Sequence, residues 1–169
     1  LLAHNLGVSV ESLENIGCAW VSSRKAYAFP MFSGTGHCVG IRLRLRDGRK
    51  LSVRGGKEGL FMPHGHRSTC YLMEGPTDLA AALTLGLWGV GRPSCRGAVA
   101  HTQVTINRLG IQRVVIIGDN DQPGIDGAKA LAGELAVPVA SMLLPTNDLR
   151  EYVRLGGTLD LLKSLERQL

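Results

Sequence analysis

The chain has 169 residues, of which 44% are hydrophobic and 20% are charged, and its formal net charge is +5 at pH 7. This length and apolar content can build one hydrophobic core of ordinary size with a smaller appended lobe. No apolar run reaches membrane length and no signal-peptide pattern occurs, so we expect a soluble, cytoplasmic protein that does not enter a membrane. The four cysteines are isolated, without a CxxC pair, which argues against a zinc knuckle or a disulfide framework.

The positive charge is concentrated in the first part of the chain. Residues 1–68 hold ten Lys and Arg against four Asp and Glu, giving +6, whereas residues 69–169 hold nine against ten, giving −1. Taking 1–68 and 69–169 as two units, we expect a basic lobe and an acidic crevice that form different surfaces. A basic surface of this kind attracts a polyanion such as nucleic acid.

The first unit is predicted to begin with a helix and to continue as a β-rich segment. Ser9 can cap a helix that runs through Ile16, with Gly17 as its stop. Further on, aliphatic residues alternate with Arg42, Arg44 and Arg46, a period of two that predicts a strand with three guanidinium groups on one face.

This strand is expected to form a hairpin with residues 47–49 as its loop. That register places Leu45 opposite Leu51 and Arg42 opposite Arg54, and it keeps the aliphatic side chains together. Like charges opposite one another destabilise a sheet, and a bound phosphate backbone would offset this. An ordinary solvated hairpin face is the alternative. Beyond it, two glycines followed by Lys57 offer flexible backbone and a cation for a nucleotide phosphate, although a bare Gly-Gly is a weak signal.

The second unit alternates short apolar runs with helical segments. Strands are expected at 71–74, 87–90, 114–117 and 137–140. Helices are expected at 76–86, 101–109 and 123–136, with a last one from Thr146 or Asn147 to Gly156. Short strands separated by helices predict an α/β fold built on an open parallel sheet with right-handed crossovers.

Acidic residues follow two of these strands. Glu74 ends one run, and Asp119 and Asp121 follow another. Ligands of open α/β sheets bind outside the carboxyl ends of the strands, so these acids should share one crevice. If strand geometry persists, the two aspartates lie roughly 6.6 Å apart and point the same way. Carboxylates in contact repel by roughly 4 kcal/mol per pair at an effective dielectric near 20, and a divalent cation removes that repulsion. All-oxygen ligands favour Mg²⁺ or Mn²⁺ over Zn²⁺.

Structural roles for the same residues remain open. The aspartates lie in a sequence typical of a turn, in which their side chains would bond to the backbone. Asp78 could complement a helix N-terminus. Lys129, one to two helical turns after the aspartates, could counter their charge or lie in solvent. Glu74 has no obvious capping duty, which favours a functional role.

These motifs resemble the Toprim domain of primases, topoisomerases and some nucleases. The matching residues are Glu74-Gly75 with Asp78, the Asp119-x-Asp121 pair and Gly124. The segment 144–152 is similar to one that follows in bacterial-type and phage primases, where it contributes a further acid, here Asp148.

The first unit resembles the small basic subdomain that precedes Toprim in phage and bacterial-type DNA primases. The similar stretches are 29–32, 40–44, 47–50 and 59–63, and topoisomerases do not begin this way. The two resemblances together run from about Gly7 to Gly156. They imply a Toprim-like parallel sheet flanked by helices, with a small N-terminal basic β-rich subdomain.

The resemblance implies a DNA primase core that makes RNA primers on a single-stranded DNA template from ribonucleoside triphosphates, with Mg²⁺ or Mn²⁺. Asp119, Asp121 and Asp148 would hold metal, and Glu74 would act in catalysis. A replicative helicase, separate or fused, is an expected partner. The residues implied in nucleotide or nucleic-acid binding are Arg42, Arg44, Arg54, Lys57, Asp78 and Lys129.

Two other functions remain open at this point. A Toprim nuclease would use the same acids to cut a phosphodiester, and a non-catalytic module would only bind nucleic acid. The chain begins with Leu1 rather than Met, and neither an upstream zinc-binding domain nor a helicase P-loop occurs in these residues. We therefore expect a fragment of a longer protein, for which inactivity in isolation is a further alternative.

Overall fold

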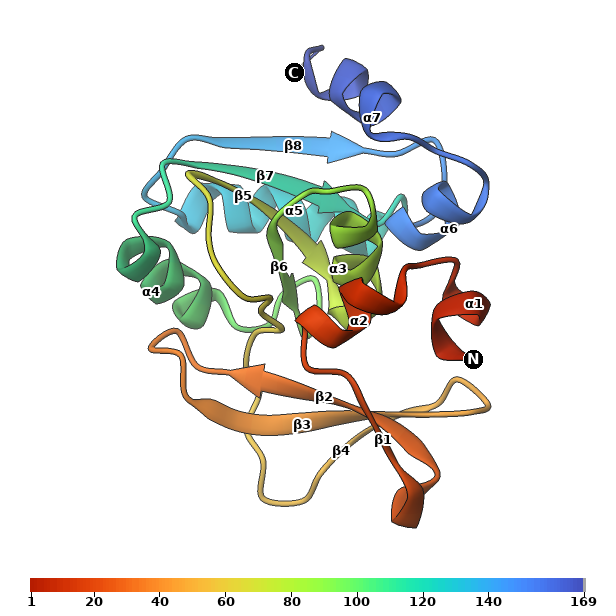
Figure 1. Cartoon of the computed structure of the whole chain (residues 1–169). Helices are drawn as coiled ribbons and strands as arrows, with labels where there is room; N and C mark the ends of the chain where they lie inside the picture. The colour runs from red at the N-terminus through yellow and green to blue at the C-terminus, as the bar shows by residue number, and fades with distance from the viewer. Residues whose placement is uncertain (169) are drawn as a thin grey trace.

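The computed structural model describes residues 1–168, which form two four-stranded sheets. The first is antiparallel, in the order β1 (Ala19–Val21), β2 (Ala26–Phe32), β3 (Cys38–Leu45), β4 (Lys50–Ser52). The second is parallel, in the order β6 (Gly89–Arg92), β5 (Thr69–Glu74), β7 (Arg113–Gly118), β8 (Val139–Leu143). Figure 1 shows the small sheet below the parallel one. The expected α/β class with a β-rich N-terminal part is confirmed.

Helices connect and cover these strands. Ser9 caps α2 by accepting a hydrogen bond from the Ser12 amide, as predicted. The last predicted helix begins at Leu149 because Asp148 caps it, and α7 was not expected from the sequence. None of the helices in the described chain has the length and apolar character needed to cross a membrane. The helices are α1 (Leu2–Leu6), α2 (Val10–Asn15), α3 (Gly75–Thr84), α4 (Val99–Leu109), α5 (Gln122–Glu134), α6 (Leu149–Arg154) and α7 (Leu159–Glu166), with a short 3₁₀ turn at Ser22–Arg24.

The parallel sheet is buried on both faces, which explains why its strands are continuous apolar runs. Alternate residues of β5 enter different cores, since side chains of a strand point to opposite faces. Tyr71 and Met73 join the core beneath α3, whereas Cys70 and Leu72 join the core beneath α4 and α5. In Figure 1, α3 lies in front of the sheet and α5 behind it. Because helices cover both faces of the sheet, a ligand-binding site is expected at the edge where the carboxyl ends of the strands lie.

The two sheets share part of one core. Phe29, Met31 and Phe61 pack with residues of α3 and of the parallel sheet. The chain between the sheets pairs with both, through bridges at Phe32 with Leu60 and at Phe61 with Gly91. Helices α1 and α2 also pack into the core beneath α3. The division of the chain into two domains at residues 68/69 stays a proposal, because α1 and α2, which belong to the first unit, pack against α3 of the second.

The hairpin of β3 and β4 differs in register from the expectation. Its loop is 46–48, because the Leu45 amide donates to the Arg49 carbonyl at 2.9 Å. Leu43 lies opposite Leu51 and Arg42 opposite Ser52, so the expected pairing of Arg42 with Arg54 is wrong. The physical cause of this register is Asp47. Its carboxylate accepts hydrogen bonds from the backbone amide of Arg49 at 3.0 Å and from the Nε of Arg49 at 2.8 Å. The shift is even, so the predicted faces survive.

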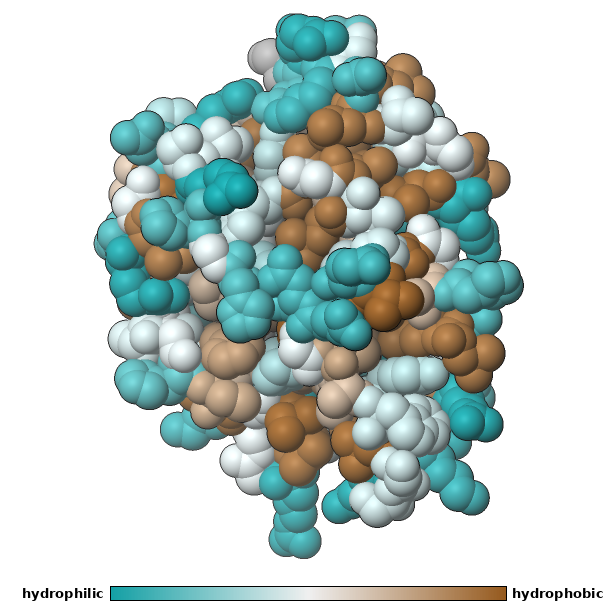
Figure 2. Space-filling model, viewed as in Figure 1, coloured by the Kyte–Doolittle hydropathy of each residue, from teal (hydrophilic) through white to brown (hydrophobic). Residues whose placement is uncertain are grey.

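Helix α7 is attached to the parallel sheet through a buried acid. Glu166 accepts from the Tyr71 hydroxyl at 2.8 Å, from Arg113 at 3.0 Å and from Lys163 at 2.8 Å. The polar bonds at Glu166 complement the apolar packing of Leu162, which is fully buried. Figure 2 shows a mostly polar surface on this side of the molecule, with apolar side chains gathered between α3 and α7.

Candidate active site

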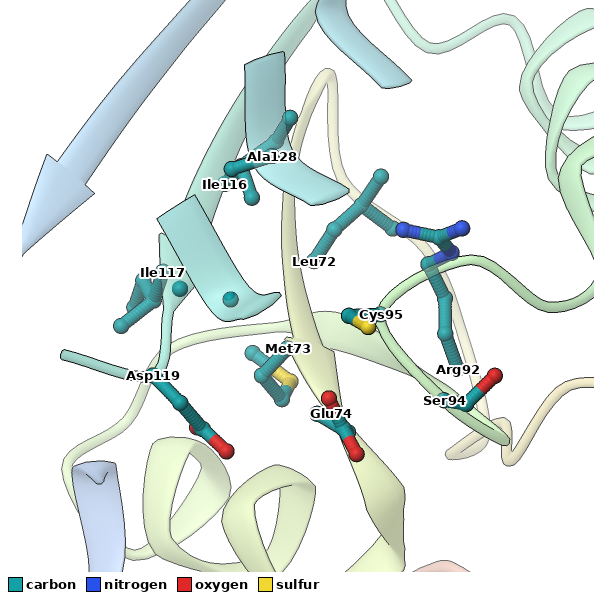
Figure 3. A pocket seen from close by; sticks show the side chains of 12 residues that line it. Leu72, Met73, Glu74, Arg92, Ser94, Cys95, Ile116, Ile117, Asp119 and Ala128 are labelled. Atoms are coloured by element: carbon teal, nitrogen blue, oxygen red, sulfur yellow. The ribbon is translucent and has the colours of Figure 1, made fainter. Parts of the chain in front are cut away.

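Two acids meet at the carboxyl edge of the parallel sheet. Glu74 ends β5, and Asp119 follows the end of β7, its parallel neighbour. Both line one pocket together with Arg92, Cys95 and residues of α5. Figure 3 shows the two carboxylates pointing to the same side of this pocket. The structure thus brings Glu74 and Asp119 into one crevice, as the strand order predicted.

Negative charge converges on Asp119. Burial, followed by the charges of Asp78, Glu74, Asp148 and Asp121, raises the pKa of its carboxyl group to about 7. A carboxyl group in such surroundings favours a proton or a cation. Within residues 1–168, however, no three His, Cys, Asp or Glu side chains are arranged closely enough to hold a metal ion by themselves.

Asp121 and Asp148 are both helix caps. Strand β7 ends at Gly118, so the strand geometry assumed for Asp119 and Asp121 does not persist. Asp121 caps α5 by accepting from the Gly124 amide at 2.7 Å, and Asp148 caps α6 by accepting from the Glu151 amide at 2.7 Å. Each carboxylate therefore has one oxygen committed to the backbone. For Asp121, the turn role left open by the sequence is the one observed.

Asp78 lies in the first turn of α3 and forms a buried ion pair. Asp78 is 6% exposed. Its carboxylate accepts hydrogen bonds from the backbone amide of Arg150 at 3.1 Å and from the Nε of Arg150 at 3.2 Å. Arg150 also pairs with Asp148. Burial raises the pKa of Asp78 to about 6, against the lowering effect of Arg150. The pair ties α3 to α6, and a nucleotide-binding role for Asp78 stays a prediction.

The basic face of the small sheet points toward the acidic pocket. Arg42, Arg44 and Lys50 line a pocket with Glu74 and with Thr77 of α3. The expectation that the basic lobe and the acidic crevice form different surfaces is therefore wrong. Its physical reason is the docking of the two sheets: the arginine face of β3 turns inward, against the strand ends. Phe29 and Phe61 form an apolar part of this pocket.

The three remaining basic candidates lie further out. Arg54 and Lys57 are exposed in the segment after β4, and Lys129 is exposed on α5. In the part of the chain that the structure describes, their side chains have no hydrogen bond or ion pair with protein. The structure does not bring Lys129 into the acidic pocket, in agreement with the exposed position left open by the sequence.

Sequence reasoning missed Arg92, which lines the pocket with Glu74 and Asp119. It ends β6, is 4% exposed, and donates from Nε at 3.1 Å and from Nη2 at 2.9 Å to the Gly97 carbonyl. Burial lowers the pKa of its guanidinium, while Cys95 and Glu74 raise it. Its place after a short apolar strand is the same signal that identified Glu74.

The donor set fits Mg²⁺ or Mn²⁺. Mg²⁺ is usually bound through one or two carboxylates with substrate phosphates and water completing its shell, rather than by an all-protein cage. Glu74 and Asp119 are two carboxylates of this kind, and the other polar side chains of the pocket lining are those of Ser94, Cys95 and Arg92.

Comparisons with known proteins complete the description. No protein-family model matches the sequence, and no curated protein matches it. Several solved structures, however, are similar to this chain. The primase fragment of the bacteriophage T7 primase-helicase protein has a TM-score of 0.74 at 19% identity, over 96% of this chain and 72% of that chain. The Aquifex aeolicus primase, comprising zinc-binding and RNA polymerase domains, has a TM-score of 0.78 at 15% identity, over 98% and 54%.

The E. coli primase catalytic core is a third, with a TM-score of 0.70 at 15% identity, over 99% of this chain and 71% of that chain. In each case the match takes in both the small antiparallel sheet and the parallel sheet, since it spans nearly all of this chain. The chain therefore has the fold of the bacterial and phage DNA primase catalytic cores.

Proposed function

We propose that this chain is the catalytic core of a DNA primase, which joins ribonucleotides into a primer on a single-stranded DNA template. One observation carries the proposal: cationic side chains of the small sheet and Glu74 of the parallel sheet line one pocket. A nucleoside triphosphate and a template both present phosphate, so phosphate-binding cations beside a carboxylate site suit phosphodiester formation. The shared primase fold supports the same assignment.

The small sheet would hold phosphate. Arg42, Arg44 and Lys50 supply up to three positive charges to the pocket. The Nε atom of Arg42 is buried and has no partner in the described chain. Leaving such a donor unpaired costs about 1 to 3 kcal/mol, and a bound phosphate oxygen would remove that cost. Contacts of this kind position a backbone without reading sequence.

The strand-end acids would hold the divalent cation. Glu74 and Asp119 are the proposed principal ligands, and acceptance of the proton of the attacking 3′-hydroxyl is the alternative role proposed for Glu74. Asp121 and Asp148 are proposed as further ligands through the oxygens not used in helix caps, which for Asp148 means displacing Arg150. A bound Mg²⁺ ion neutralises triphosphate charge and lowers the pKa of a coordinated hydroxyl group.

The partners follow from the same proposal. One similar structure is a primase catalytic domain bound to single-stranded DNA, which supports that polymer as template here. Arg54, Lys57 and Lys129 are exposed and are proposed to extend its track. The bacteriophage T7 protein is a primase-helicase, which supports a replicative helicase, separate or fused, as partner. A replication enzyme of this kind would act in the cytoplasm.

The test is primer synthesis from labelled ribonucleoside triphosphates on single-stranded DNA with Mg²⁺. Wild type is expected to make labelled RNA, and Asp119→Ala and Glu74→Gln to make less than about one hundredth as much, as for loss of a principal catalytic group. Asp126→Asn is the matched control, because Asp126 is an exposed acid on α5, the helix that follows Asp119.

Three results would contradict the proposal. Full activity of Asp119→Ala would mean that Asp119 takes no part in primer synthesis. Shortening of the DNA without RNA synthesis would favour a nuclease. Salt-sensitive DNA binding without any chemistry, which survives Glu74→Gln and weakens in Arg42→Ala, would favour a non-catalytic binding module.

A further inference from the structure

Arg92 is a buried cation that has no carboxylate partner within ion-pair distance in the described chain. Two of its N–H groups instead converge on a single acceptor, the Gly97 carbonyl, at 3.1 and 2.9 Å. Burying a guanidinium against a neutral acceptor is unfavourable unless the arrangement brings something else. Such departures from ordinary packing occur mainly at functional sites.

The loop that Arg92 holds, residues 93–98, has a strained backbone. Ala98, at its end, has φ of 57°, in the left-handed region. A residue with a Cβ atom in that region costs roughly 1 to 2 kcal/mol. The turn before it is closed by the Gly97 amide, which donates to the Ser94 hydroxyl at 3.0 Å. The bonds from Arg92 help to keep this strained loop in one place.

The same loop lies against the acidic pocket and against α5. Ser94 and Cys95 line the pocket with Glu74 and Asp119. A Cβ atom at Gly127 of α5 would lie 2.8 Å from both Cβ and O of Cys95, so the loop rests directly on the helix. At the start of that helix, a Cβ at Gly124 would lie 2.4 Å from the Asp119 carbonyl oxygen. Close contacts therefore run from Arg92 through the loop and α5 to Asp119.

Arg92 is also tied to the other acid. It is the β6 residue directly paired with Glu74 of β5. Figure 3 shows its guanidinium pointing away from both carboxylates. It is therefore placed to fix the backbone around the acids rather than to contact what they bind.

We propose that Arg92 is a positioning residue of the acidic pocket, which sets Glu74 and Asp119 at the separation that a shared divalent cation needs. It does so by holding the 93–98 loop between β6 and α5. The inference deepens the proposed function and rests on it for activity, whereas cation binding tests it separately.

Two substitutions perturb the loop without changing the charge of the pocket. Arg92→Lys keeps the positive charge and cannot make both bonds to Gly97. Gly127→Ala leaves Arg92 intact and pushes the loop from the opposite side, where the added methyl group has no room beside Cys95. Arg92→Met removes the charge as well as the bonds. Arg108→Lys is the matched control, because Arg108 donates from Nε at 2.9 Å to the Gly34 carbonyl, away from the pocket.

The measurement is Mn²⁺ binding by electron paramagnetic resonance, with thermal unfolding and primer synthesis on the same samples. Arg92→Lys and Gly127→Ala are expected to weaken Mn²⁺ binding about tenfold, the usual loss when a group that supports metal ligands is removed. They should lower kcat by a similar factor while the KM for nucleotide stays within twofold. Arg108→Lys should bind Mn²⁺ as wild type does.

The inference is overturned if Arg92→Lys and Gly127→Ala lose thermal stability but bind Mn²⁺ like wild type, which would make Arg92 merely structural. It is equally overturned if only Arg92→Met changes Mn²⁺ affinity, since charge rather than position would then matter. A rise in KM alone would mean direct substrate contact, and a wild type without Mn²⁺ affinity would leave no site to position. A wild type that binds Mn²⁺ yet makes no primers contradicts the proposed function alone.

Discussion

Asp119→Asn should stabilise the folded protein in the absence of metal, because the acid carries a stability cost at high pH. Burial, followed by the charges of Asp78, Glu74, Asp148 and Asp121, raises the pKa of Asp119 to about 7. An unfolded Asp has a pKa of about 3.9, so the folded chain binds this proton more tightly. The resulting stability is present below about pH 4 and is lost as the pH rises through about 7.

The magnitude follows from the shift. About three pKa units at about 1.4 kcal/mol each correspond to about 4 kcal/mol for a fully buried group. Asp119 is only half-buried, and solvent screening reduces this to about 2 kcal/mol. Asparagine has nearly the same shape and no charge. The free energy of unfolding of the variant should therefore exceed that of wild type by about 2 kcal/mol at pH 8, and by less than about 1 kcal/mol at pH 5.

The assay is urea unfolding in EDTA at both pH values, followed by repetition at pH 8 with millimolar Mn²⁺. Mn²⁺ should stabilise wild type, because it replaces the missing proton among the acids, and should stabilise the variant much less. Glu134→Gln, at the far end of α5, serves as a control for removal of an acid away from the strand end. A variant that is no more stable than wild type at pH 8 would refute the idea that the acids repel one another.

Further outcomes follow from other contacts. Asp78→Ala should lower the free energy of unfolding by about 1 to 3 kcal/mol in denaturant titrations, because the amide and the Nε of Arg150 lose their acceptor and Arg150 keeps only Asp148. Arg44→Ala should weaken binding of single-stranded DNA and reduce the slope of log affinity against log salt by about 1, measured by fluorescence anisotropy. Tyr71→Phe should cost about 1 to 2 kcal/mol of stability, because Glu166 loses a buried donor, and should leave primer synthesis unchanged.

The features predictable from the sequence are those that depend on local pattern and strand order. The apolar runs ending at Glu74 and before Asp119 identified β5 and β7, and parallel strands necessarily bring their carboxyl ends to one edge. Ser9 as a cap was equally local. The acidic pocket could be predicted because it needs only these elements and no knowledge of how the small sheet docks.

Other features depend on tertiary packing that a single sequence does not reveal. A two-residue shift of hairpin register leaves every side chain on its face, so the pattern around Leu43 could not distinguish the two registers. The pattern also groups Arg42 with Arg44 without indicating that their face turns toward Glu74. The strand-end position of Arg92 is visible in the sequence, but its burial against the Gly97 carbonyl depends on how the 93–98 loop folds.

The most direct test is an anomalous difference map from crystals soaked in MnCl₂, because Mn²⁺ is visible to X-rays and replaces Mg²⁺ chemically. We predict an anomalous peak at the carboxyl edge of the parallel sheet, from a Mn²⁺ ion bound to oxygens of both Glu74 and Asp119. A map with no peak between these two side chains, under conditions that support primer synthesis, would contradict the account.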